Sequence, residues 1–132
     1  NAIGPGKRPA HTLCPVMGFV DGRLRFLMGT PGGPGQTITL TQVLSGLVDH
    51  KMDLAAAVAA PRWSMNLAGE VLLEAAVGDN AARGVGDLGL KVERVGPGNP
   101  FFGSAEAIEI RPDGVLVGVA DRRREAAAMG VC

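Results

Sequence analysis

The chain turns at a stretch rich in glycine and proline, Gly29-Thr30-Pro31-Gly32-Gly33-Pro34-Gly35-Gln36-Thr37. It joins a strand-like run, Arg25–Met28, to an apolar run with helical spacing, Ile38–Val48. Glycines let the backbone turn sharply and bring bare N–H groups against a ligand, and the start of the following helix adds unpaired donors and positive potential. This corner is therefore predicted to hold an anion: a phosphate, a carboxylate or the transient oxyanion of acyl transfer.

Three helices are predicted on the C-terminal side of the corner. In Thr37–Lys51 the apolar residues recur at nearly 3.6-residue spacing. Alanine-rich Leu54–Ala60 follows Asp53, which is a good N-cap residue, and is stopped by Pro61. Asn80–Leu88 is the third, although its glycines disfavour a helix.

Strands are predicted on both sides of these helices. Val16–Val20 and Leu24–Met28 form a hairpin with Asp21-Gly22 as its two-residue turn, which is typical of that connection. A second hairpin surrounds Pro112-Asp113-Gly114, and two single strands lie between the hairpins. The remaining predicted strands are Val71–Glu74, Lys91–Val95, Ala105–Ile110 and Val115–Val119. This order predicts one α+β domain over residues 1–132.

Composition excludes several classes of protein. The chain has 132 residues, of which 46% are hydrophobic, and its 13 basic residues balance 13 acidic ones. We therefore expect no nucleic-acid partner and no binding to a membrane surface. No apolar run reaches the roughly 20 residues that span a bilayer. Cys14 and Cys132 have no metal-ligand spacing and are not expected to pair, so neither a metal nor a cofactor is predicted.

The grouping of the strands predicts exposed sheet edges. A chain this short buries only about two-thirds of its unfolded surface, and here helices divide the apolar strands into separate groups. Such edges need another chain or subunit to pair with, so an isolated chain is expected to self-associate. Because the sequence begins with Asn1 in loop-like composition, we expect a processed subunit or a fragment.

Short stretches along the whole chain resemble, in the same order, the C-terminal part of the small subunit of gamma-glutamyltransferases. These stretches are Gly4-Pro5-Gly6-Lys7-Arg8-Pro9, Cys14-Pro15, Gly29-Thr30-Pro31-Gly32-Gly33, Gln42-Val43-Leu44, Val48-Asp49-His50-Lys51-Met52, Ala57-Val58-Ala59-Ala60-Pro61-Arg62 and Asp121-Arg122-Arg123. The resemblance implies a portion of an N-terminal-nucleophile hydrolase, an αββα sandwich in which helices cover two stacked, mostly antiparallel sheets. It also implies a bacterial protein of the periplasm or cytoplasm.

The resemblance implies a chemistry as well. In this family a threonine exposed by self-cleavage attacks a gamma-glutamyl amide, with its own α-amine as base, and the acyl group passes to water or an amine. Gly32 and Gly33 match the glycines whose N–H groups form the oxyanion hole, where losing one donor typically raises the barrier by about 3–4 kcal/mol. The implied partners are the large subunit and the N-terminal part of the small subunit.

Two departures from the family pattern affect the expected activity. The nucleophile is missing, since residue 1 is Asn and every threonine of the chain is internal, so the chain alone should be inactive. Gamma-glutamyltransferases usually carry Ser-Ser where this chain has His11-Thr12, and those hydroxyls grip the substrate's α-carboxylate. His11 and Thr12 are therefore candidate substrate-binding residues, and the change favours relatives that act as acylases on glutaryl-type side chains.

Structural interpretations remain open beside the functional ones. Gly32-Gly33 is also compatible with an ordinary strand-to-helix turn, His11 with a packed or solvent-facing side chain, and Thr12 with a hydroxyl bonded to its own loop. The alternative function is a non-catalytic anion- or phosphate-binding or assembly module. A P-loop is disfavoured because the Lys-Ser/Thr pair is absent. Two further expectations are that Trp63 anchors packing and that the run Arg122-Arg123-Arg124 faces water or pairs with Asp121 and Glu125.

Overall fold

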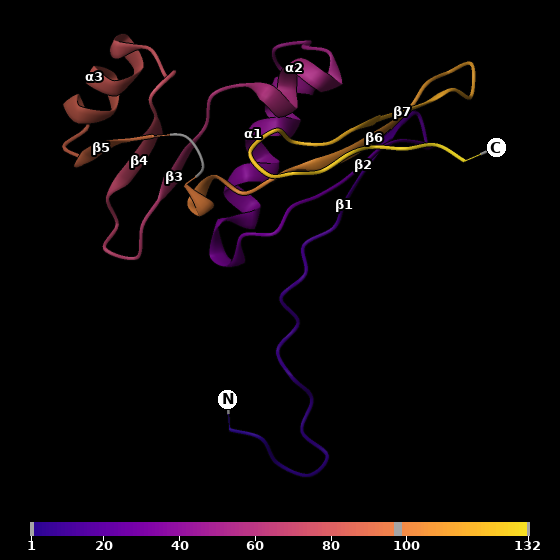
Figure 1. Cartoon of the computed structure of the whole chain (residues 1–132), viewed down its shortest axis with the longest axis horizontal. Coiled ribbons are helices and arrows are strands. Elements are labelled where there is room, and N and C mark those ends of the chain that lie inside the picture. Colours follow the sequence, from indigo (N-terminus) through magenta and orange to yellow (C-terminus); the bar gives the residue numbers. More distant parts are fainter. Residues whose placement is uncertain (1, 97–98, 132) are drawn as a thin grey trace.

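Two β-sheets form the frame of the chain in a computed structural model that describes residues 2–96 and 99–131 (Figure 1). One sheet is fully antiparallel, with the strands in the order β1-β2-β6-β7. These strands are Val16–Val20, Arg23–Gly29, Glu106–Ile110 and Leu116–Val119. The other sheet has the order β3-β4-β5, made of Trp63–Met65, Val71–Glu74 and Val92–Val95. Its β4–β5 pair is parallel, and the α3 helix, Asp79–Asp87, connects those two strands.

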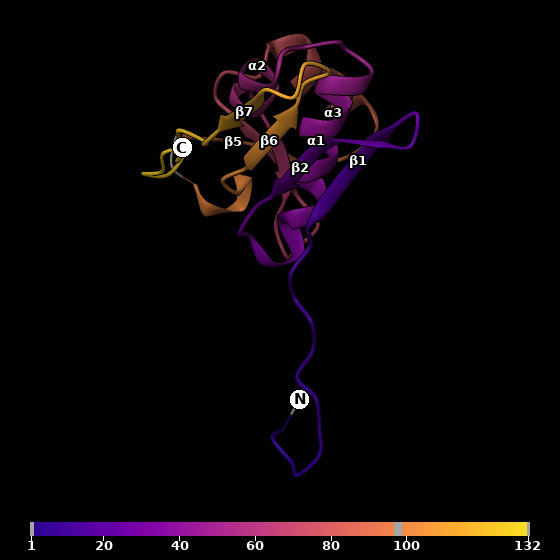
Figure 2. The same ribbon diagram turned by 90° about the vertical axis from the view of Figure 1, so that its right-hand side faces the viewer.

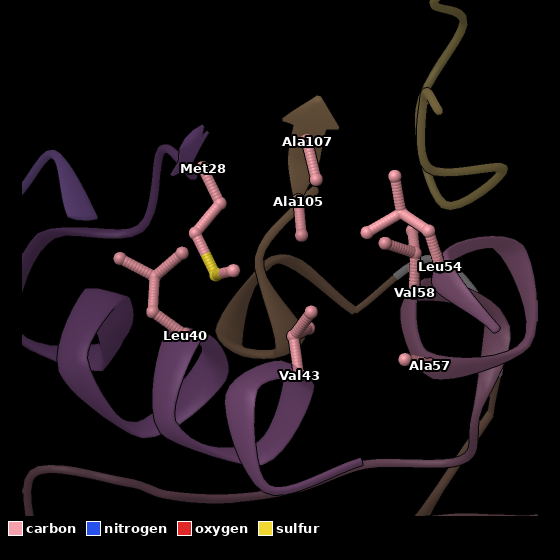
Figure 3. Close-up of a cluster of buried hydrophobic side chains, with 8 residues drawn as sticks. All are labelled: Met28, Leu40, Val43, Leu54, Ala57, Val58, Ala105 and Ala107. Atoms are coloured by element: carbon pink, nitrogen blue, oxygen red, sulfur yellow. The ribbon is translucent and has the colours of Figure 1, made fainter. Parts of the chain in front are cut away.

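Two helices pack against the four-stranded sheet and form the core with it. The α1 helix spans Gln36–Val48 and the α2 helix spans Leu54–Ala59. Side chains two residues apart on a strand point to the same face of a sheet. Met28 of β2 and Ala107 of β6 lie on the face that meets the helices. Figure 3 shows side chains from the sheet, the loop before β6 and both helices converging in one cluster. It consists of Met28, Leu40, Val43, Leu54, Ala57, Val58, Ala105 and Ala107.

The local signals in the sequence operate as predicted. In the first hairpin Asp21 and Gly22 both have positive φ, 50° and 75°, as a type I′ turn requires. The Asp53 carboxylate accepts a hydrogen bond from the Ala56 N–H at 2.8 Å and caps α2. The second hairpin closes around Pro112-Asp113-Gly114, and every predicted helix and strand is present with ends shifted by at most a few residues.

One strand was not predicted, and the expectation for Trp63 was wrong. Trp63 lies in β3, which pairs with β4, and its side chain is 42% exposed rather than an anchor of the packing. Its backbone makes the connection instead, because the Gln42 side chain accepts from the Trp63 N–H and donates to the Trp63 carbonyl, both at 2.9 Å. A strand of three residues held by a distant side chain has no pattern in the local sequence.

The other face of the four-stranded sheet is apolar and open. Met17, Ile108 and Leu116 are 61%, 40% and 66% exposed, and the β1 and β7 strands lie at the two edges of the sheet. Figures 1 and 2 both show the N-terminal stretch, residues 2–15, extending away from the rest of the chain. The α1 and α2 helices thus form one layer on the four-stranded sheet, and the opposite, apolar face of this sheet is largely open, as in part of a sandwich. Among the helices of the described part, none is both long enough and apolar enough to cross a membrane.

Candidate functional site

The glycine corner, which we define as residues Gly29 to Gly35, connects β2 to α1. Gly32 and Gly33 have φ of 148° and 52°, values that favour glycine. The Gly35 N–H donates to the Gly32 carbonyl at 3.0 Å, which closes a short 3₁₀ turn over Gly33–Gly35 directly before the helix. A residue with a side chain would be strained at either position, so the sharp exit from the strand depends on these two glycines.

The amides of the corner are available to a ligand. Within the described residues, no group accepts a hydrogen bond from the Gly32 N–H or the Gly33 N–H. Gly33 is exposed, and a Cβ built on it would meet no heavy atom within 4 Å. The corner is therefore a strand-to-helix connection with two free donors beside the start of a helix, a combination that stabilises negative charge.

A second loop supports the corner from its buried side. This loop is the 3₁₀ turn Pro100–Phe102 followed by Gly103, whose φ is 66°. A Cβ at Gly103 would lie 2.6 Å from Thr30 Oγ1 and 3.2 Å from the Pro31 carbonyl oxygen. Only glycine permits so close an approach, and the second loop thereby fixes the buried side of the corner.

The sequence missed a residue that connects two candidate sites. Gln36, the first residue of α1, donates from Nε2 to the Thr12 carbonyl at 2.7 Å and to the Gly33 carbonyl at 3.1 Å. It therefore holds the segment that carries His11 and Thr12 beside the corner. A glutamine directly after a glycine-rich turn was the only signal for this contact in the sequence.

Both candidate substrate-binding side chains are exposed. His11 and Thr12 lie in the extended segment before β1 and point into no packed region. Among the described residues, no group bonds the Thr12 hydroxyl, so the interpretation of Thr12 as a loop-bonded hydroxyl was wrong; its carbonyl makes the contact instead. The hydroxyl and the imidazole remain free to meet a ligand.

A buried ion cluster, made of Arg62, Glu74, Asp121 and Arg123, lies behind the second loop. Arg62 Nη1 is 2.7 Å from Asp121 Oδ2, and Arg123 Nη2 is 2.5 Å from Glu74 Oε2. Arg123 Nη1 also lies 3.1 Å from Asp121 Oδ1. The expectation that the basic run faces water or pairs within its own segment was partly wrong, because Arg123 is largely buried and its second partner, Glu74, comes from β4.

The cluster shifts the pKa values of its carboxylates downward. Burial alone would raise the pKa of Asp121, but hydrogen bonds from the Ala105 and Arg123 amides and the charge of Arg62 outweigh it. For Glu74, bonds from Arg123 and from the Arg62 amide likewise outweigh burial and lower the pKa. Burial lowers the pKa of Arg62 itself, yet a guanidinium keeps its proton in proteins, so the cluster is ionised.

The cluster also reaches the loop that supports the corner. Arg62 Nη1 donates to the Phe102 carbonyl at 3.0 Å, and the Thr39 hydroxyl of α1 donates to the same oxygen at 3.2 Å. Phe102 is 1% exposed, which fixes the second loop in the core. Two of the stretches that the sequence singled out, at Arg62 and at Asp121-Arg122-Arg123, therefore meet behind the glycine corner.

Two hollows lie elsewhere on the described surface. An apolar groove of about 600 Å³ runs over the open sheet face, where Met17, Leu27, Ile108 and Leu116 line it together with the segment Ala127 to Gly130. A second hollow of about 630 Å³ is lined in part by Pro61, Glu74, Arg122 and Arg123. Neither Gly32 nor Gly33 lines either hollow, so the corner is an open surface site in this part of the chain.

The remaining residues that the sequence singled out are the cysteines and the side chains that could bind a metal. Cys14 is partly buried against the core, while its pairing with Cys132 falls outside the described residues. Among residues 2–96 and 99–131, no three His, Cys, Asp or Glu side chains gather in a way that would hold a metal ion. The candidate site is thus the glycine corner with the segment that Gln36 holds beside it.

Comparison with known proteins gives a consistent result over the full chain. The profile of one family, Gamma-glutamyltranspeptidase, matches residues 1–131. The chain is 36% identical over 136 aligned residues to the glutathione hydrolase-like YwrD proenzyme of Bacillus subtilis, an alignment that covers 99% of this chain and 26% of that protein. It is 35% identical to the acylase ACY 1 proenzyme of Pseudomonas sp., covering 98% of this chain and 23% of that protein.

Solved structures agree with the sequence comparison. A cephalosporin acylase from Bacillus halodurans superposes with a TM-score of 0.82 at 30% identity, over 98% of this chain and 25% of that one. A gamma-glutamyltranspeptidase from Pseudomonas nitroreducens, complexed with L-DON, superposes with a TM-score of 0.80 at 29% identity, over all of this chain and 68% of that one. The chain spans about a quarter of the length of these two curated proenzymes.

Proposed function

This chain belongs to the gamma-glutamyltranspeptidase family, and from that premise we propose that it forms the oxyanion-binding part of an amidohydrolase or acyltransferase. The proposed substrate is an amide of a gamma-glutamyl or glutaryl-type acyl group, which the enzyme transfers to water or to an amine. The proposed nucleophile is a threonine outside this stretch, whose own α-amine removes the hydroxyl proton. Each threonine in this chain has peptide bonds on both sides and lacks that α-amine.

One observation carries the proposal: the amides of Gly32 and Gly33 are both free within the described residues and lie in adjacent peptide units. When a hydroxyl oxygen attacks the substrate's carbonyl carbon, a C–O bond forms and the carbonyl π electrons move to oxygen. Two preorganised N–H donors stabilise that charge more than they stabilise the neutral carbonyl, which lowers the barrier. Collapse of the intermediate then breaks the C–N bond, the leaving nitrogen takes the proton that the α-amine had removed from the hydroxyl, and the acyl-enzyme remains.

The far end of the acyl group is proposed to meet His11 and Thr12. A gamma-glutamyl and a glutaryl group both end in a carboxylate, and an exposed hydroxyl and imidazole are suitable donors to it. Gln36 supports this assignment, since it bonds the Thr12 carbonyl and the Gly33 carbonyl with the same Nε2 atom. A binding segment held to the oxyanion corner would position the scissile carbonyl.

The proposal is tested by Gly33→Leu in the whole enzyme, with Gly22→Leu as the matched control. Both glycines have positive φ, 52° and 75°, and at both a Cβ would enter open space, so the backbone strain is comparable. Only Gly33 lies at the corner, where a leucine would occupy the space before the amides. Hydrolysis of gamma-glutamyl and glutaryl anilides should fall by about 100-fold or more in Gly33→Leu alone. Full turnover in a folded Gly33→Leu enzyme would refute the oxyanion role.

The non-catalytic alternative makes a different prediction. A phosphate- or carboxylate-binding module would bind inorganic phosphate measurably in isothermal titration calorimetry and would hydrolyse neither anilide. Gly33→Leu should abolish that binding heat, because a side chain would block the same amides. Phosphate binding without amide hydrolysis by the whole protein would favour this module over the enzyme.

A further inference from the structure

Thr30 makes two hydrogen bonds with a single hydroxyl. Its side chain is 9% exposed at the end of β2, directly before the glycines. The Ser104 N–H donates to Thr30 Oγ1 at 3.0 Å, and Thr30 Oγ1 donates to the Pro31 carbonyl at 2.8 Å. Because an amide only donates, the Ser104 contact uses an oxygen lone pair, and the hydroxyl proton is left for the Pro31 carbonyl.

This hydroxyl bond fixes the direction of the Gly32 amide. The Pro31 carbonyl and the Gly32 N–H belong to the same peptide unit, which is planar and trans. In such a unit the N–H points opposite to the C=O. The Pro31 carbonyl turns toward the buried Thr30 hydroxyl, so the Gly32 N–H must point away from it.

The neighbouring amide is held in the same manner by the backbone. The Gly32 carbonyl accepts from the Gly35 N–H at 3.0 Å, so the Gly33 N–H, at the other end of that peptide unit, also has a fixed direction. One donor of the pair is therefore oriented by a backbone turn and the other by a side chain. Of these two, only the side chain can be changed by a single substitution without rebuilding the turn.

The Thr30 hydroxyl is itself held firmly. Gly103 allows the second loop to approach so closely that an ideal Cβ there would meet Thr30 Oγ1 at 2.6 Å. That loop is anchored at the Phe102 carbonyl by Arg62 and Thr39. Ser104, which donates to Thr30, is 1% exposed and follows the same loop. The two hydrogen bonds that link Ser104, Thr30 and Pro31 are thus held by the packing of the core.

We propose that Thr30 is a positioning residue that presets the Gly32 N–H for the oxyanion. This inference rests on the proposed function, because it assigns a role to Thr30 within the same site. Thr30 does not touch the substrate; it keeps the Pro31–Gly32 peptide unit from rotating. An amide that had to rotate during the reaction would lose the advantage of preorganisation.

The test compares three variants of the whole enzyme. Thr30→Val keeps the shape of the side chain but removes the hydroxyl, while Thr30→Ser keeps the hydroxyl. Ser45→Ala is the control, since it removes a hydroxyl of α1 that bonds the Asp49 carboxylate at the far end of the helix from the corner. For the anilide substrates, kcat should fall about 10- to 100-fold in Thr30→Val with KM within threefold. Thr30→Ser and Ser45→Ala should retain kcat within about threefold.

Crystal structures of the variants give a readout that does not depend on activity. The Pro31 carbonyl should keep its direction in Thr30→Ser and should turn away in Thr30→Val. An unchanged carbonyl direction in Thr30→Val would overturn the proposal, and so would a loss of kcat shared equally by Ser45→Ala. A fully active Thr30→Val beside an inactive Gly33→Leu would refute the role of Thr30 alone, whereas a fully active Gly33→Leu would refute the proposed function.

Discussion

The guanidinium of Arg62 and the carboxylate of Asp121 meet at 2.7 Å, with side chains only 2% and 1% exposed. Arg62 follows the α2 helix and Asp121 follows the β7 strand, so the pair joins two distant parts of the chain. Arg62 also donates to the Phe102 carbonyl, which belongs to the loop behind the glycine corner. This ion pair therefore connects the stability of the core with the geometry of the candidate site.

Removing one partner of this pair should destabilise the protein strongly. Asp121→Ala leaves the Arg62 charge buried without that partner and leaves the Ala105 and Arg123 amides without their acceptor. The expected loss is about 3–5 kcal/mol of the free energy of unfolding, measured by urea denaturation. The control is Asp79→Ala, whose carboxylate bonds Arg94 but is 81% exposed and should matter by less than about 1 kcal/mol. Equal losses of the free energy of unfolding in both variants would show that the buried pair stabilises the protein no more than the exposed one.

The buried ion cluster predicts a loss of stability in acid. Hydrogen bonds and the Arg62 and Arg123 charges hold the pKa values of Asp121 and Glu74 below their ordinary values near 4. In that range the unfolded state binds more protons than the folded state, so the stabilisation is complete above about pH 5 and is lost as the pH falls below about 4. Urea denaturation at several pH values should show this slope. It should be shallower in Glu74→Gln, and an unchanged slope would contradict the assignment.

Gln36 should control substrate binding more than stability. In Gln36→Glu a carboxylate oxygen replaces the Nε2 donor and faces the Thr12 and Gly33 carbonyls, which releases the segment with His11. The α1 helix itself should tolerate the change, because an acidic residue at a helix start is favourable. We expect KM to rise about threefold to tenfold, from the loss of bonds worth about 1 kcal/mol each.

Gln42→Glu serves as the control for Gln36→Glu. Gln42 lies on the same helix, and its Nε2 donates to the Ile38 and Trp63 carbonyls, away from the corner. This control should reduce the free energy of unfolding and leave KM unchanged. The same rise of KM in both glutamate variants would mean that Gln36 acts only through the helix.

His11 should influence the choice of acyl group. If His11 lies at the substrate carboxylate, His11→Ser restores the hydroxyl pair typical of gamma-glutamyltransferases. The ratio of kcat/KM for gamma-glutamyl over glutaryl anilide should then rise by about tenfold, the value of a hydrogen bond to a charged group. His50→Ser, at the exposed end of α1, should leave the ratio as it is. A constant ratio in His11→Ser would remove His11 from the acyl pocket.

Much of the fold could be predicted from the sequence because the signals for it lie between residues close in the chain. The two-residue turn at Asp21-Gly22 requires positive φ at both residues, and it predicts where the first hairpin turns. Asp53 directly before an alanine-rich run caps a helix, and it predicts where α2 begins. The glycine corner was readable for the same reason, since Gly32 and Gly33 adopt conformations that other residues avoid. The short β3 strand was not readable, because the Gln42 side chain that holds it comes from another element.

The sequence by itself determined the helices, every strand except β3, their order and the position of the free amides, because turns, caps and apolar spacing act between residues close in the chain. A local backbone turn orients the Gly33 amide, but only the tertiary structure decided what holds the Thr30 hydroxyl that orients the Gly32 amide. Thr30, Ser104 and Arg62 are common polar residues in unremarkable local contexts, and their hydrogen bonds reach partners far away in sequence. Leaving a buried polar group without a hydrogen-bond partner costs free energy. Each of these buried groups therefore keeps the position in which its hydrogen bonds form, and this fixes the geometry of the corner.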